Sequence, residues 1–215
     1  MSEQPFQVAH LDELERLPRG EGLLWRPIRR RFGISAFGVN AYSADEAGER
    51  VVEEHHERDG HEELYVVVAG HALFTLGEEE RDAPAGTLVF VRPGTRRGAI
   101  AREAGTIVVG VGAKPGVVFE PSQWEEWAAA EAYRTLGRPE EARALMDASV
   151  AANPDAWQGY YNLACFESLD GRREEAFAAL GRAVELAPDE VRKYATADAD
   201  FDAIRGDPRF AELVG

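Results

Sequence analysis

The C-terminal half of this chain repeats itself at a fixed interval, and this interval constrains the fold more than any other feature. A glycine, an alanine and a proline recur 34 residues apart, at positions 137 and 171, 142 and 176, and 154 and 188. A unit of this length cannot bury its own apolar face, so it is stable only when it is stacked on its neighbours. The sequence therefore predicts an array of paired helices, with glycine at the turns and alanine where helices cross closely.

The repeated pattern resembles the tetratricopeptide repeat. The second copy carries the packing positions of that motif most completely, namely Tyr160, Leu163, Ala164, Gly171, Ala176, Ala183 and Pro188. The first copy lacks the early tryptophan–leucine pair and keeps fewer positions, namely Tyr133, Gly137, Ala142 and Pro154. The resemblance implies that this half of the chain binds a protein or a peptide.

The motif also indicates which residues would form the binding groove of the second repeat. They are uncharged, namely Gln158, Tyr161, Cys165 and Ser168. We therefore expect a partner that is held by apolar contacts and hydrogen bonds, with little dependence on salt.

The last residues are expected to cap the helical stack. Asp207 is placed to cap the N-terminus of a final helix, with Pro208 at the first helical position. Four apolar residues would cover the last open face of the array, namely Phe201, Ile204, Phe210 and Leu213.

Residues 23–119 have a sequence pattern typical of a β domain. Short apolar runs at 64–68, 72–76, 87–91, 98–101 and 106–111 are separated by turns rich in glycine and proline. The run Leu64–Val68 is continuous, as in a strand that is buried on both faces. The histidine-rich stretch before it, which begins near Gly48, is expected to form a loop. Many short strands with no helical period between them indicate an antiparallel barrel, closed or sandwiched.

The sequence pattern changes from one typical of β-strands to one typical of helices near Pro121. Ser122 and Glu125 have the spacing of a capping box, which marks the start of a helix. We therefore expect a polar N-terminal segment at residues 1–22 and a β-barrel at 23–119. Residues 120–215 would form two repeats followed by capping helices.

The β domain resembles the cupin superfamily over about residues 30–113. The family has two sequence motifs, and the first of them matches this chain in part. Glu63 and Gly70 hold their motif positions, with six residues between them. Counting back from Glu63 places His56 at the first histidine position of the motif. The second histidine position is occupied by Arg58.

In the second cupin motif, the glycine positions match this sequence, but the histidine and asparagine positions do not. Gly86 and Gly94 hold their positions, and the proline has moved by one residue to Pro93. The histidine position is occupied by Arg97 and the asparagine position by Ala101. The resemblance implies a cupin-like antiparallel β-barrel, followed here by an α-helical repeat array.

The cupin resemblance implies a divalent metal held by three imidazoles and one carboxylate. A guanidinium group has no lone pair and carries a permanent charge, so Arg58 and Arg97 would repel a cation. We therefore expect Arg58, Glu63 and Arg97 to bind a small ligand, with an anion as the natural class. The alternative is an unusual metal site formed by His56, His61 and Glu63.

Structural roles compete with these functional ones. His61 is expected to form a hydrogen bond with a neighbouring carboxylate, and Glu63 can form a structural ion pair with Arg97. The basic run at 29–31 is expected to be exposed charge before a strand. Cys165 is expected to lie in the core of a repeat.

The overall charge restricts the classes of partner. The chain has 24 basic and 39 acidic residues and a formal net charge of −15, which argues against nucleic acid and an anionic membrane surface. A single cysteine rules out an internal disulfide and fits a reducing cytoplasm. No apolar run is long enough to span a membrane. A homodimer is expected to form through the barrel, with Leu23 to Phe37 as the pairing surface.

Three functions remain compatible with the sequence. The first is a module that binds or senses a small ligand in the barrel and contacts a protein through the repeats. The second is a metal-dependent enzyme acting on a small acid as a dioxygenase, isomerase or decarboxylase. The third is a structural adaptor without a ligand. The barrel scaffold itself does not choose among them, because one fold hosts many functions.

Overall fold

The computed structural model describes residues 6–57, 60–119 and 123–215 of the chain. Arg58 and Ser122, to which the sequence assigns a ligand-binding and a capping role, lie outside the described residues. The chain divides into two compact units, residues 1–121 and 122–215. Within the described residues, no helix is both long and apolar enough to cross a membrane.

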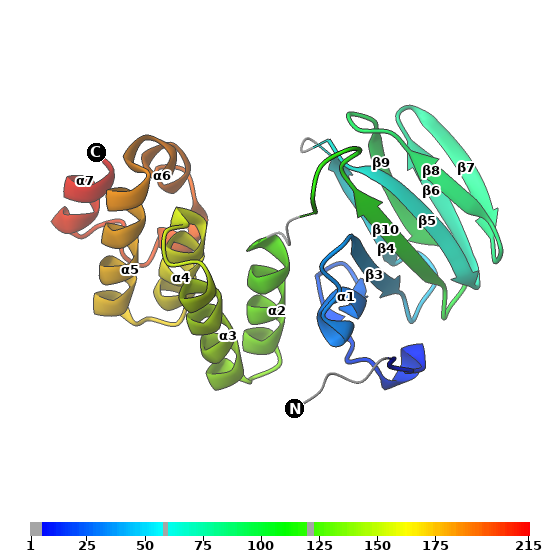
Figure 1. Cartoon of the computed structure of the whole chain (residues 1–215), viewed down its shortest axis with the longest axis horizontal. Coiled ribbons are helices and arrows are strands. Elements are labelled where there is room, and N and C mark those ends of the chain that lie inside the picture. Colours follow the sequence, from blue (N-terminus) through cyan, green and yellow to red (C-terminus); the bar gives the residue numbers. More distant parts are fainter. Residues whose placement is uncertain (1–5, 58–59, 120–122) are drawn as a thin grey trace. The chain divides into compact units, whose positions relative to one another are not determined.

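The first unit consists of two antiparallel sheets (Figure 1). Its strands are β1 (Leu17–Pro18), β2 (Leu24–Arg26), β3 (Gly38–Ser43), β4 (Arg50–His56), β5 (Glu62–Ala69), β6 (His71–Leu76), β7 (Glu79–Pro84), β8 (Leu88–Val91), β9 (Arg96–Ala101) and β10 (Ile107–Ala113). The larger sheet has the order β1-β2-β3-β10-β5-β8, and the smaller has the order β4-β9-β6-β7. An antiparallel β unit of short strands is thus confirmed, in its sandwiched form.

The core of the β unit lies between the two sheets and is built from small and β-branched residues. Val67 and Val108 of the larger sheet and Ala72 and Phe74 of the smaller sheet are fully buried there. Tyr65 joins them, with its ring 5.7 Å from that of Phe74. Side chains that alternate along each strand meet in the same interior, because residues i and i+2 point to one face of a sheet.

Two expectations for the strands are wrong. Residues Arg50–His56 of the histidine-rich stretch form strand β4, which pairs with β9, so the expected loop is limited to the residues that follow, His61 among them. The run 64–68 is buried on one face only, since Leu64 and Val68 are 38% and 44% exposed. Apolar residues on its outer face give the run its continuous appearance, although the strand alternates between core and solvent.

The N-terminal residues pack onto the larger sheet. A 3-10 turn (Leu11–Glu13) and helix α1 (Ile28–Phe32) flank strands β1 and β2. The expectation that residues 29–31 are exposed charge before a strand is wrong for Arg29, because this residue lies in α1 and is buried. Its guanidinium Nη1 donates to the Ile34 carbonyl at 3.5 Å.

The second unit is a helical array (Figure 1). Its helices are α2 (Gln123–Thr135), α3 (Pro139–Ala152), α4 (Trp157–Leu169), α5 (Arg173–Leu186), α6 (Pro188–Ala195) and α7 (Pro208–Val214), with a 3-10 turn η2 (Ala199–Phe201) between the last two. Gly137 and Gly171 end equivalent helices with φ angles of 73° and 74°, which side chains with a β-carbon strongly disfavour. The 34-residue period therefore corresponds to two helix pairs with equivalent turns.

The repeat core uses alanine where helices approach closely. Ala142, Ala164, Ala176 and Ala183 are all fully buried. Phe166 of α4 packs with Met146 of α3, which joins the first helix pair to the second. The predicted small residues thus lie in the helix contacts of the array.

The C-terminal residues cap this array as expected. Asp207 is the N-cap of α7, where its side chain accepts a hydrogen bond from the Arg209 backbone N–H, and Pro208 follows at the first helical position. Phe201, Ile204 and Phe210 are buried in the same core as α4 and α5, and Leu213 packs partly against it. Phe201 lies edge-on to Tyr161, with ring centroids 5.5 Å apart.

Because Phe201 is fully buried, its truncation should destabilise the repeat unit. We expect Phe201→Ala to lower the free energy of unfolding by about 3–5 kcal/mol through lost transfer energy and a cavity. The measurement is urea unfolding of the full chain followed by circular dichroism in the helical region. Tyr194→Ala is the control, since Tyr194 is 49% exposed, and it should cost far less. Equal losses for the two variants would contradict the capping role.

Candidate functional site

Strand register brings four polar side chains together between the two sheets. Glu63 and Tyr65 lie on β5, and their alternation with Leu64 directs them to the interior. On the smaller sheet, His55 of β4 and Arg97 of β9 are direct cross-strand partners. One end of the interior is therefore polar, whereas the rest is filled by the valine-rich core.

Arg97 is the most deeply buried member of this cluster, with a side chain that has no exposed surface. Its Nε lies 3.1 Å from Oε2 of Glu63, in an ion pair that crosses from one sheet to the other. Its Nη2 donates to the Arg92 carbonyl at 3.1 Å. Neither Nε nor Nη1 has an aligned hydrogen bond among the described residues. The sequence-based expectation of a Glu63–Arg97 pair is thus met, with part of the guanidinium left unsatisfied.

The neighbours of the Glu63 carboxylate all contact the same oxygen, Oε2. Tyr65 donates its hydroxyl to Oε2 at 2.9 Å, and His55 Nε2 lies 3.7 Å from the same atom. The other ring nitrogen of His55 is 2.9 Å from the Glu53 carbonyl, which fixes the orientation of the imidazole.

Glycine on strand β10 provides the space for these side chains. Gly112 and Gly110 are the direct partners of Glu63 and Tyr65. A β-carbon at residue 112 would lie 3.3 Å from Cγ of Glu63, and one at residue 110 would lie 3.2 Å from Cε1 of Tyr65. Larger residues would displace the carboxylate and the phenol, so the glycines help to position the cluster.

The electrostatics of the cluster favour charge on Glu63 and on His55. Burial raises the pKa of Glu63, but hydrogen bonds from His55 and Tyr65 and the charge of Arg97 outweigh burial, so the pKa is lowered overall. The Glu63 carboxylate raises the pKa of His55 against the opposing effect of burial. Burial and the Glu63 charge together raise the pKa of Tyr65 far above its usual value, so its hydroxyl stays protonated.

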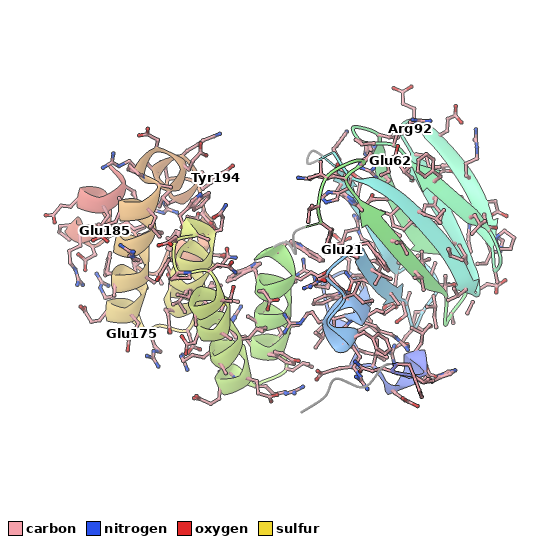
Figure 2. The ribbon with its side chains drawn as sticks, viewed as in Figure 1. Glu21, Glu62, Arg92, Glu175, Glu185 and Tyr194 are labelled. Atoms are coloured by element: carbon pink, nitrogen blue, oxygen red, sulfur yellow. The ribbon has the colours of Figure 1, made fainter. Side chains whose placement is uncertain are left out.

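In the loop after β4, Glu57 connects the described residues to one another. Glu57, which is buried, accepts hydrogen bonds at Oε2 from the backbone N–H groups of Gly60 and His61. Its Oε1 lies 2.8 Å from Nδ1 of His61, so the expected pairing of His61 with a carboxylate is confirmed. The Gly94 N–H donates to the Glu57 carbonyl, which ties this loop to the turn before Arg97. Figure 2 labels Glu62 and Arg92, which lie at this end of the unit and form an ion contact of 4.0 Å.

The structure separates the three residues of the alternative metal site. His56 is exposed and pairs across the strands with Arg96, on the face opposite to His55. His61 is engaged by Glu57, and Glu63 by Arg97. His55 takes the interior position that motif counting assigned to His56. Alternation along β4 places His55 and His56 on opposite faces, but it does not tell which of them faces inward, because Val51 and Val52 are both buried and the register with β9 shifts along the strand.

The described residues at this position do not fit a divalent metal. A guanidinium group without a lone pair occupies the interior beside Glu63, and it supplies a positive charge where a cation would have to lie. Among the described residues, three or more potential ligand groups converge only at Cys165, Asp198 and Asp200 in the helical unit. The interior of the β unit thus presents a guanidinium group at the position where the cupin resemblance implies a metal-binding histidine.

The outer face of the smaller sheet carries a separate groove of about 270 Å³. It is lined by Glu21, Gly48, Arg50, Glu54, Leu73, Thr75, Glu80, Gly98, Ala99 and Ile100. Its charged groups form exposed ion pairs, such as that between Glu54 and Arg96 at 2.7 Å. None of the expected site residues lies in it.

In the helical unit, most of the expected groove positions of the second repeat are covered by the chain itself. Tyr161, Cys165 and Ser168 are buried, and only Gln158 is exposed. Asp198 accepts a hydrogen bond from the Tyr161 hydroxyl at 2.6 Å, and Phe201 packs on the Tyr161 ring. The expectation that these four residues form an open groove is therefore wrong, because three of them are buried, and the segment before and within η2 packs on Tyr161 and Cys165.

Comparisons with known proteins agree with the helical unit. The model of the tetratricopeptide repeat family matches residues 127–156 and 158–190. These two segments correspond to α2–α3 and α4–α5, and tetratricopeptide repeats suggest interaction with a protein. No curated protein matches the chain.

The chain is also similar to solved structures of cupin proteins. An RmlC-like cupin from Shewanella frigidimarina is 18% identical with a TM-score of 0.41, over 54% of this chain and 97% of that one. A Cupin 2 conserved barrel domain protein from Salinispora arenicola is 16% identical with a TM-score of 0.45, over 54% and 94%. KdgF from Halomonas sp. is 18% identical with a TM-score of 0.41, over 47% and 86%.

Removing one partner of the Glu63–Arg97 pair should be costly. We expect Glu63→Gln to lower the free energy of unfolding by about 3–5 kcal/mol, because Arg97 is then buried without its counter-ion. Adding Arg97→Met to this variant should recover part of the loss. Glu62→Gln is the matched control, since the Glu62–Arg92 contact is exposed and worth about 1 kcal/mol at most. Urea unfolding of the four proteins tests this, and equal effects at residues 62 and 63 would contradict it.

The raised pKa of His55 predicts a pH dependence of stability. A histidine whose pKa is higher in the folded state than in the unfolded state contributes its stabilisation below its ordinary pKa of 6.5, and loses it as pH rises through the folded value. Between about pH 5.5 and about pH 8, wild type should therefore lose stability relative to His55→Gln. The measurement is urea unfolding of both proteins across this range, and parallel curves would exclude the His55–Glu63 contact as the cause.

Proposed function

We propose that the β unit binds a small anionic ligand at Arg97 and that the repeat unit contacts a protein. The supporting observation is the buried guanidinium of Arg97, whose Nη1 has no hydrogen-bond partner among the described residues. A buried donor without an acceptor costs free energy, and more so when the group is charged. An anionic oxygen at Nη1 would remove this cost.

The neighbours of Arg97 support an anion more than a metal. Glu63 balances one positive charge, and His55 adds a second one when it is protonated. A bound carboxylate would form charge-assisted hydrogen bonds with the guanidinium, which are about twice as strong as neutral ones. The metal-dependent enzyme receives less support, because His56 lies on the opposite face and His61 is held by Glu57.

The wider assignment combines this binding site with the repeats. In this proposal the protein functions in the cytoplasm, in keeping with its single buried cysteine. It also forms a homodimer. The pairing surface expected at residues 23–37 is partly used within the unit, since Leu23 and Trp25 are buried. Exposed apolar side chains lie instead on the outer face of β5 and β8, namely Leu64, Val68, Leu88 and Phe90.

Acetate serves as the simplest probe of the proposed binding site. We expect the full chain to bind acetate and Arg97→Ala to lose this binding, as measured by calorimetric titration or chemical-shift changes. Arg96→Ala is the matched control, because its side chain pairs with Glu54 on the opposite face of the same strand, and it should bind as wild type does.

The metal content of the same proteins distinguishes the anion site from a metal-dependent enzyme. If wild type contains a stoichiometric transition metal, and Arg97→Ala loses neither acetate binding nor fold, the anion site is excluded. Arg97→His restores one imidazole at the motif position. Its comparison with wild type shows whether a metal can be accepted once the guanidinium is removed.

A further inference from the structure

Glu63 presents an acceptor beside the unsatisfied donor of Arg97. Among the described residues, Tyr65, Arg97 and His55 all approach the carboxylate at Oε2. None of the described residues donates a hydrogen bond to Oε1 of Glu63. Because Glu63 stays ionised at neutral pH, Oε1 is a strong acceptor that a ligand could use.

The donor and the acceptor belong to one ion pair, in which the Arg97 side chain is fully buried and Glu63 is 20% exposed, so a ligand would approach from the Glu63 side. Arg97 Nη1 belongs to the same guanidinium whose Nε lies 3.1 Å from Glu63. Gly112, directly opposite Glu63 on β10, leaves the wall next to the carboxylate without a side chain. A ligand bound here meets a positive donor and a negative acceptor a few atoms apart.

From this arrangement we infer that the ligand is a small carboxylic acid that carries a hydroxyl group, a conclusion that rests on the proposed anion site. Its carboxylate accepts from Arg97 Nη1, and its hydroxyl donates to Glu63 Oε1. A carboxylate without a donor leaves Oε1 unused and adds a second negative charge beside Glu63. The hydroxyl converts that repulsion into a hydrogen bond.

An ammonium group in place of the hydroxyl fits less well. Arg97 already lies against the Glu63 carboxylate as a positive group, and His55 adds a second one when it is protonated. A third positive group would meet repulsion from both, whereas a neutral hydroxyl does not. The site thus selects a hydroxy acid over the corresponding amino acid.

Three two-carbon acids that differ in one substituent test this inference on the wild-type chain. Acetate has a hydrogen at the variable position, glycolate a hydroxyl and glycine an ammonium group. We expect glycolate to bind at least about tenfold more tightly than acetate, as for a hydrogen bond to a charged group. Glycine should bind more weakly than glycolate. Calorimetric titration at neutral pH gives the three dissociation constants.

The outcomes separate the inference from the proposed function. Equal affinities for acetate and glycolate, both lost in Arg97→Ala, would overturn the hydroxy-acid assignment and leave the anion site standing. Tighter binding of glycine would also overturn it. Binding of none of the three would overturn the anion site and this inference together.

Glu63→Gln provides an independent check of the acceptor. The amide keeps an oxygen but loses the negative charge, so the preference for glycolate over acetate should shrink towards unity. A preference unchanged in this variant would show that Glu63 is not the acceptor. If the variant does not fold, the comparison of the three acids on wild type remains decisive.

Discussion

The Glu63–Arg97 ion pair is the interaction on which the organisation of the β unit depends. It crosses from β5 in the larger sheet to β9 in the smaller one, at the end of the interior that the valine-rich core does not fill. Burying a guanidinium without a counter-ion is very costly, so Glu63, Tyr65 and the glycines of β10 must hold their positions for Arg97 to remain inside. The same requirement produces the candidate site, because the pair leaves Nη1 of Arg97 without an acceptor.

A fixed guanidinium gives this site a chemistry different from that of a metal. The donors of a guanidinium group have a fixed planar geometry that suits carboxylates. Charge in the cluster varies through His55, whose raised pKa depends on Glu63. The proposed function therefore assigns to this guanidinium the binding and orientation of an anion.

The helical unit obeys a different constraint, which is the need to close the end of a short stack. Two repeats leave an apolar face uncovered, and residues 198–214 cover it. Phe201 and Asp198 pack on Tyr161 of α4, so the residues that a longer array would expose are here part of the core. Capping thus competes with binding for the same face, and any protein contact must use other parts of the repeats.

The sequence by itself determined what depends on local pattern and on period. The 34-residue interval, the N-cap at Asp207 and the alternation of short β segments were enough to predict the antiparallel β unit, the repeat array and its cap. The pairing of Glu63 with Arg97 followed from motif positions. The tertiary structure alone decided which histidine faces inward, because a shift of one residue along β4 exchanges His55 for His56. It also closed the groove of the second repeat, since contacts between α4 and residues 198–201 depend on how the chain returns and not on local sequence.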